Sequence, residues 1–276
     1  MKISLITATL GRITEFETLI ISLCAQTYKN FEFIVIDQNT HFDLQKLIQK
    51  YSNKININYI RSDIKGLSYN RNIGLLQSTG DIFAFPDDDC YYKEDVLETA
   101  AQAFHNNPNM LFCTLPIYDT VNTDHCHIFK HGNPCIKRNQ IHKYCISYNF
   151  FIKQSQTVFD DRLGVGTEFS SGEETDYLFS VVDCKSSGLY IDKSKIYHPK
   201  NDLYDITPDR AYKYGLGFGA LFKKEILVRH HYSGFCRFLY YLLRSFAGAI
   251  IRPSKRNIYI NTLKGRIRGF IKFRIK

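Results

Sequence analysis

Short apolar runs alternate with stretches in which apolar residues recur at helical spacing over the first 115 residues. The apolar runs predict strands at 3–8, 31–36, 55–59, 82–85 and 110–115. The helical spacing predicts helices at 13–23, 44–51, 67–77 and 94–104. Strands that alternate with helices are typical of a mostly parallel sheet covered on both faces. We therefore expect an α/β fold.

Polar residues directly follow three of these strands. They are Thr9, Asp37 and the triplet Asp87, Asp88 and Asp89. Ligands of open α/β sheets bind outside the carboxyl ends of the strands. The sequence therefore predicts one crevice that contains all five side chains.

The acidic triplet is costly at the end of a buried strand, because like charges raise one another's pKa. A hard divalent cation is the usual compensation, since carboxylate oxygens bind it together with substrate phosphates. A solvated acidic turn is the alternative. Pro86 before the triplet and the residues 90–92 after it argue against a freely solvated loop.

A second acidic cluster, at residues 172–176, opens a helix predicted near 174–182. Acidic residues in a first helical turn are favourable for the helix dipole alone. The functional alternative is a carboxylate base that faces an acceptor hydroxyl, with Glu174 and Asp176 as candidates.

Single residues elsewhere carry weaker signals. Arg71 is suited to a phosphate or a carboxylate, although a single arginine is more often an exposed residue without a role. A single histidine such as His198 is usually a surface or core residue. Histidines and cysteines at 125–135 match no zinc-finger spacing. Glycines at 215–219 do not follow a strand, so a dinucleotide-binding loop is rejected.

The composition, 44% apolar and 23% charged over 276 residues, excludes wholesale disorder. Eight cysteines without a Cys-x-x-Cys pair, and no apparent leader, predict reduced thiols in the cytosol. The net charge of +9 belongs to the end of the chain, because residues 229–276 contain twelve Lys or Arg and no Asp or Glu. Such a separation favours an anionic partner, either a membrane or a nucleic acid.

The basic tail contains a mostly apolar stretch at 235–251, with Arg237 and Arg244 on one helical face. Since the chain has no run of ~18 uncharged apolar residues, we expect no multipass membrane protein. We expect instead a helix in the membrane interface, followed by basic residues near an anionic leaflet. The alternative is a helical pair that packs on the preceding domain.

Seven segments of the chain together resemble a known protein family, although none of them is specific by itself. They are 22–28, 31–37, 65–68, 71–74, 80–89, 159–164 and 171–176. In this order they resemble family 2 glycosyltransferases, over about residues 1–228. The resemblance implies a GT-A fold, which is Rossmann-like, and transfer of a sugar from a nucleotide diphosphate sugar with inversion. It implies a nucleotide-sugar-binding half at 1–115 and an acceptor half at 116–228, before a membrane-associating tail at 229–276.

The resemblance also assigns donor contacts. Thr9 and Asp37 match positions that hold the nucleoside. Gln38 stands where many members carry a second Asp that reads the base, and a UDP-sugar remains the expected donor. Arg71 matches a residue near the ribose and diphosphate, and Asp88 is expected nearer the ribose.

Metal and base are assigned in the same way. Asp87 and Asp89 match the ends of the family's Asp-x-Asp motif, with Asp89 as the expected direct ligand of Mn²⁺ or Mg²⁺. His198 matches a late metal-binding histidine of some members. Glu174 matches the general base, with Asp176 as its rival. A metal would neutralise the leaving diphosphate, while the base takes the acceptor's proton.

The expected partners are a nucleotide-sugar donor, a glycan or lipid-linked saccharide acceptor and an anionic membrane surface, without nucleic acid. The expected location is the cytoplasm, peripheral at the inner face of the cell membrane. One alternative is a nucleic-acid-binding protein that uses the basic tail, although it leaves the acidic clusters unexplained. Another is a nucleotidyltransferase on a similar fold, which would release pyrophosphate.

Overall fold

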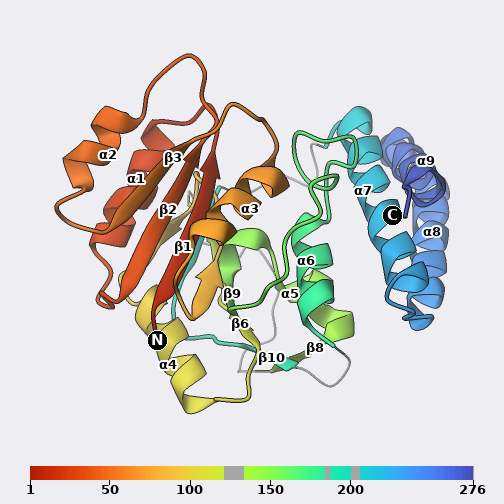
Figure 1. Ribbon diagram of the computed structural model, residues 1–276. Helices are drawn as coiled ribbons and strands as arrows, with labels where there is room; N and C mark the ends of the chain where they lie inside the picture. Colours follow the sequence, from red (N-terminus) through yellow and green to blue (C-terminus); the bar gives the residue numbers. More distant parts are fainter. Residues whose placement is uncertain (121–133, 184–186, 200–205, 276) are drawn as a thin grey trace. The chain divides into compact units, whose positions relative to one another are not determined.

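The apolar runs near the N-terminus form the parallel half of an eight-stranded sheet in a computed structural model (Figure 1). The model describes all residues except 121–133, 184–186, 200–205 and 276. The parallel strands are β1 (Ile3–Thr9), β2 (Phe31–Asp37), β3 (Ile57–Arg61) and β4 (Ile82–Ala84). Their order is β3-β2-β1-β4, and Thr9 lies opposite Asp37 at the carboxyl end. The predicted mostly parallel α/β fold is confirmed.

Four further strands extend the sheet beyond β4. They are β9 (Phe150–Lys153), β6 (Phe112–Thr114), β10 (Ser187–Tyr190) and β8 (Cys135–Lys137). β9 runs antiparallel to both β4 and β6, β10 runs parallel to β6, and β8 forms an antiparallel edge. Only β6 is predicted from the sequence pattern. The other three strands are short, and their pairing partners are distant in the chain.

Helices cover both faces of this sheet. One face packs on three helices, α1 (Thr14–Cys24), α2 (Gln45–Tyr51) and α4 (Val96–Asn106). Their apolar residues share a core with Ile3 and Leu5 of β1. Ile6 of β1 points to the other face, where it meets α3 (Leu67–Gln77). A Cβ at Gly74 of α3 would stand 2.3 Å from Cγ2 of Ile6, so this approach requires glycine.

A second, three-stranded sheet joins distant segments. It consists of β5 (Tyr91–Tyr92), β11 (Ile196–His198) and β7 (Ile117–Asp119), with β11 in the centre. β11 pairs antiparallel with β5, the strand that directly follows the acidic triplet. This pairing brings His198 to the triplet across more than a hundred residues of sequence.

The contacts divide the chain into two compact units, and each is described by itself. The first comprises Met1–Lys65, Tyr69–Val158 and Ser180–Lys200, and the second comprises Gly66–Ser68, Phe159–Phe179 and Asn201–Lys276. The short helices of the first unit are η1 (Arg138–Gln140), α5 (Ile141–Tyr144) and η2 (Ser147–Asn149). The helices of the second are α6 (Glu173–Val181), α7 (Pro208–Leu227), α8 (Ser233–Ile251), η3 (Pro253–Lys255) and α9 (Arg256–Lys272).

Helix α7 packs closely on α9. The boundary predicted at residue 228, between the domain and the tail, therefore falls inside the second unit. Four glycines make this approach possible, namely Gly215 and Gly219 of α7 and Gly265 and Gly269 of α9. A Cβ on Gly269 would stand 2.1 Å from the carbonyl oxygen of Leu216. The glycines that superficially resemble a dinucleotide loop therefore belong in part to a helix contact.

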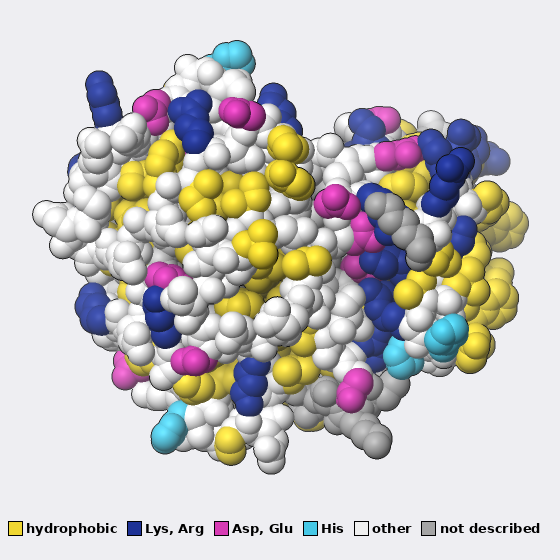
Figure 2. All heavy atoms as spheres, in the orientation of Figure 1, with side chains coloured by type: hydrophobic (Ala, Val, Ile, Leu, Met, Phe, Trp, Pro, Cys, Tyr) yellow, Lys and Arg dark blue, Asp and Glu magenta, His cyan; other side chains and the backbone are white. Residues whose placement is uncertain are grey.

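Helix α8 exposes an apolar stripe that consists of Phe235, Leu239, Leu243, Phe246 and Ile250. These residues recur three or four positions apart, so they share one helical face. Hydrophobic and basic side chains lie side by side over the C-terminal helices (Figure 2). Among the described residues, α8 is the one helix that could cross a membrane by length and composition.

Candidate active site

The three carboxylates that follow β4 contact different partners within the first unit. Asp88 is buried and accepts hydrogen bonds from the Thr9 hydroxyl at 2.8 Å and the Leu10 backbone N–H at 3.3 Å. Arg12 bridges the triplet, with Nη1 2.5 Å from Asp88 and Nη2 2.9 Å from Asp89. Asp88 is thus tied to the end of β1, as expected if the strand ends form one crevice.

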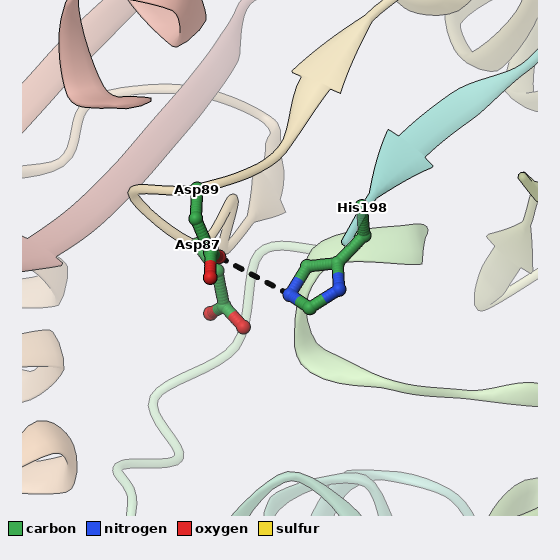
Figure 3. A group of neighbouring side chains, drawn as sticks. All are labelled: Asp87, Asp89 and His198. Carbon is green, nitrogen blue, oxygen red and sulfur yellow. Dashed lines mark ion pairs between the residues drawn. The ribbon is translucent and has the colours of Figure 1, made fainter. Parts of the chain in front are cut away.

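Asp87, Asp89 and His198 form a separate group (Figure 3). One potential ligand atom from each lies within 4.8 Å of the others, and Nε2 of His198 is 3.1 Å from Oδ1 of Asp89. The other ring nitrogen, Nδ1, is 2.6 Å from the carbonyl oxygen of Pro199. The ring also stacks on Tyr148, with centroids 4.2 Å apart. These contacts orient Nε2 towards the carboxylates.

Burial and the neighbouring charges have opposite effects on the pKa values in this group. Burial alone would raise the pKa of Asp89, but the hydrogen bond and charge of His198 hold that pKa below its usual value. Burial alone would lower the pKa of His198, yet the bond to Asp89 and the charges of both aspartates raise it. Asp88 differs, because burial raises its pKa despite the opposing contacts with Arg12 and Thr9. Positive charge is therefore favoured between Asp87 and Asp89.

The donor set fits a divalent cation such as Mn²⁺ or Mg²⁺. Two carboxylates and an imidazole offer oxygen and nitrogen ligands at a common point, a combination that suits Mn²⁺ well. A ligand histidine normally has its second ring nitrogen held by a carbonyl or carboxylate, as Pro199 holds that of His198. Asp87, Asp89 and His198 are the residues that would hold the ion.

Arg71 of α3 reaches the same loop from the other face of the sheet. Its side chain is buried, and Nη2 lies 2.8 Å from Oδ1 of Asp87. The Ser147 hydroxyl donates to the same oxygen at 3.2 Å. Arg71 also lies over the ring of Phe85, with 5.9 Å between its guanidinium carbon and the ring centroid. A guanidinium in this position can neutralise negative charge beside Asp87.

Asp37 and Gln38 continue the polar edge at the end of β2. Asp37 is buried and accepts hydrogen bonds from the Tyr59 hydroxyl at 2.6 Å and from the Asn39 backbone N–H at 2.8 Å. Gln38 accepts one from Asn70 at 2.9 Å. These contacts fix both side chains at the strand edge. The first unit thus brings together every predicted site residue except Glu174 and Asp176.

The two remaining candidates belong to the second unit. Asp176 is buried between two cations, 2.6 Å from Nζ of Lys224 and 2.7 Å from Nη2 of Arg229. Glu174, two positions earlier on α6, is only partly buried. Both carboxylate oxygens of Asp176 are thus engaged in ion pairs within the second unit.

Several residues near the triplet have no signal in the sequence strong enough to single them out. Arg12 lies three residues beyond the end of β1, so its place near a strand end could have identified it. Ser147 and Tyr148 lie in the stretch of irregular pattern, and only tertiary contacts reveal them. Most of the histidine and cysteine group at 125–135 lies outside the described residues.

The family of the chain follows from comparison with known proteins. A model described as glycosyl transferase family 2 matches residues 4–162, which is more than half of the chain. The chain therefore belongs to glycosyl transferase family 2, and the resemblance drawn from its motifs is confirmed.

Relatives share a part of the chain. A glucosyl-dolichyl phosphate glucuronosyltransferase of Haloferax volcanii is 27% identical over 112 residues, which are 40% of this chain and 36% of that protein. The poly(ribitol-phosphate) beta-N-acetylglucosaminyltransferase TarS of Staphylococcus aureus is 30% identical over 105 residues, 37% of this chain and 18% of TarS. The matched segments span well under half the length of these relatives.

Solved structures match almost the whole chain. A crystal structure of residues 1–349 of TarS with UDP-GlcNAc superposes with a TM-score of 0.70 at 18% identity, covering 98% of this chain and 82% of that one. A mannosyltransferase from Pyrobaculum calidifontis, in complex with GDP-Man and Mn²⁺, gives 0.65 at 10% identity, covering 99% and 88%. At such identities the likeness establishes the fold, and the predicted GT-A fold is confirmed.

Proposed function

We propose that the chain transfers a sugar from a nucleotide diphosphate sugar, with UDP as the expected nucleotide, to a hydroxyl of a glycan or lipid-linked acceptor. The observation that carries this proposal is the group of Asp87, Asp89 and His198 at the strand ends of a family 2 chain. Family membership supplies the reaction class, and the group supplies a place for the diphosphate.

Donor binding uses the edge formed by β1 and β2. Thr9, Asp37 and Gln38 hold the nucleoside, and Asp88 lies nearer the ribose. Arg71 stabilises the negative charge that develops on the leaving diphosphate. A divalent cation held by Asp87, Asp89 and His198 would neutralise the same charge when bound.

Acceptor activation uses the second unit. Glu174 takes the proton of the acceptor hydroxyl during attack, which contributes typically 10²–10⁴-fold to such reactions. Asp176 positions the start of α6 through Lys224 and Arg229. One attack on the face opposite the leaving group inverts the anomeric carbon, and a single base carboxylate is sufficient for it.

The C-terminal helices place the enzyme at the inner face of the membrane. The apolar stripe of α8 is exposed, and the residues 229–276 contribute basic but no acidic side chains. Such a combination favours a helix that lies in the interface and beside anionic lipids. A lipid-linked acceptor would be met at the same surface.

Calorimetric titration with UDP, GDP and dTDP, with and without Mn²⁺, tests the donor site. We expect Mn²⁺-dependent binding of one nucleotide, weakened about 10- to 100-fold in Asp89→Asn. Asp63→Asn is the matched control, because Asp63 is an exposed aspartate of the same unit. Metal-independent binding, or equal loss in both variants, would contradict the assigned metal site.

Product analysis separates the alternatives. A transferase releases nucleoside diphosphate from the donor, whereas a nucleotidyltransferase releases pyrophosphate. A nucleic-acid-binding protein would instead show steeply salt-dependent binding of DNA or RNA that Asp89→Asn leaves intact. Membership of glycosyl transferase family 2 favours the first outcome.

A further inference from the structure

A pocket of about 300 Å³ opens between α8 and α9 of the second unit, among residues that have no role in the proposed transfer. Its lining includes four cations and two tyrosines, namely Arg244, Arg252, Lys255, Arg266, Tyr241 and Tyr259. The chain from residue 229 onward contains no Asp or Glu. The two helices that form the pocket therefore supply positive charge without any carboxylate.

Arg266 is the inner cation of this pocket. Its Nη1 donates to the carbonyl oxygen of Tyr241 at 2.7 Å and to the hydroxyl of Ser245 at 2.6 Å. Its Nε is buried and has no hydrogen-bond partner among the described residues. Buried N–H groups are nearly always paired, because an unmet donor costs about 1–3 kcal/mol. The pocket thus contains a donor that lacks an acceptor.

The three arginines of the pocket likewise lack a carboxylate among the described residues. Burial, and then the charge of Arg244, lower the pKa of Arg266 to about 10, although Tyr241 acts in the opposite direction. Other cations of the tail do find carboxylates, since Arg237 lies 3.8 Å from Glu225. Arg244, Arg252 and Arg266 have no carboxylate within ion-pair distance in the part of the chain that is described.

We propose that this pocket binds a phosphate or diphosphate group, with Arg244, Arg252 and Arg266 as its donors. Guanidinium groups match phosphate oxygens in pairs, and three of them line this one pocket. The phosphate is carried by a lipid or is free in solution. A lipid would bind by its headgroup in the pocket while its chains contact the apolar stripe of the same helix α8. A free phosphate would use the pocket alone.

Two double variants of equal charge test the site in the full-length chain. Arg244→Gln with Arg252→Gln alters the pocket, whereas Lys264→Gln with Arg268→Gln removes two exposed cations of α9 outside it. One arm titrates inorganic pyrophosphate by calorimetry without divalent cations. The other measures cosedimentation with phosphatidylcholine vesicles that contain phosphatidic acid, a lipid with a phosphomonoester headgroup. Circular dichroism and Mn²⁺-dependent nucleotide binding confirm that all variants fold.

We expect the pocket variant to lose at least about tenfold in affinity and the control about twofold or less, since a charge-assisted pair contributes more than diffuse attraction. A selective loss in both arms supports the site with free phosphate as a sufficient ligand. A selective loss with vesicles alone supports it with a lipid headgroup as the ligand. Equal losses in the two variants, or no binding of either probe, would overturn it. None of these results depends on sugar transfer, so failure of the proposed activity is a separate outcome.

Discussion

The two acidic clusters of the chain look alike in sequence and differ in their neighbours. Asp89 lies with Asp87 and His198, whose ligand atoms all come within 4.8 Å of one another. Asp176 lies instead between Lys224 and Arg229, at 2.6 and 2.7 Å. Asp87 and Asp89 also contact an arginine each, but their oxygens converge with the imidazole of His198 on one point, which is a ligand set for a metal ion. The oxygens of Asp176 instead face Lys224 and Arg229. The first cluster is therefore suited to binding a cation, and Asp176 of the second to holding α6 in place.

The strongest test of this comparison changes Glu174, the other candidate residue of the second cluster. Glu174→Gln should lower the turnover by about 10²–10⁴-fold, because an amide cannot accept the hydroxyl proton. Binding of the donor nucleotide should stay unchanged. Release of nucleoside diphosphate measures the first quantity and calorimetry the second.

Glu15→Gln, at an exposed position of α1, is the control for this change. A loss of turnover in Glu174→Gln no larger than in the control would remove Glu174 as the base. A large loss in Asp176→Asn at unchanged stability would transfer the role to Asp176.

Stability is the quantity that Asp176 should control. Asp176→Asn removes the counter-charge that Lys224 and Arg229 share and leaves them Asp160 and Glu225. It should lower the free energy of unfolding by about 2–3 kcal/mol, the range for hydrogen bonds to a charged group. Urea denaturation measures this change, with the exposed Asp161→Asn as a control. If both variants unfold like the parent chain, the comparison between the clusters fails.

Close helix packing is a second source of stability in the same unit. Gly269→Ala places a Cβ 2.1 Å from the Leu216 carbonyl oxygen, and it should cost about 1–3 kcal/mol by forcing α7 and α9 apart. Asn257→Ala, at an exposed position of α9, controls for helix propensity. A thermal midpoint of Gly269→Ala at or above that of the control would show that stability does not depend on the close approach of α7 and α9 at Gly269.

The smallest expected effect concerns acid. Burial alone would raise the pKa of Asp160, but hydrogen bonds from Arg162 and Lys224 hold it well below its usual value. The folded state thus binds this proton more weakly than the unfolded state. The resulting stability is present above about pH 4 and is lost as the pH falls through the folded pKa.

Asp160→Asn should make stability fall less on acidification, by about 1.4 kcal/mol for each unit by which the folded and unfolded pKa values of Asp160 differ. Urea midpoints measured at several pH values below neutrality give this slope. An unchanged slope would show that the ion pairs of Asp160 do not contribute to the pH dependence of stability.

Much of the first unit can be predicted from the sequence because its signals are local. The helix at 67–77 is found at the predicted bounds, since apolar spacing within one helix records which face is buried. Thr9 and the acidic triplet meet for an equally simple reason, which is that parallel strands end at one edge. By contrast, β9 enters the sheet between β4 and β6 against the parallel pattern, and no local signal marks its partners.

The sequence by itself determined the parallel sheet, the acidic edge and the family, because periodicity and ordered motifs are properties of neighbouring residues. The family resemblance also pointed to His198 as a metal ligand beside Asp89. Tertiary structure alone decided that Arg12 contacts both Asp88 and Asp89 and that Asp176 lies between two cations. It also decided that Arg244, Arg252 and Arg266 lack a nearby carboxylate among the residues that the structure describes. These facts depend on contacts between distant segments, and the chemistry of a charged side chain is set by the charges that folding brings to it.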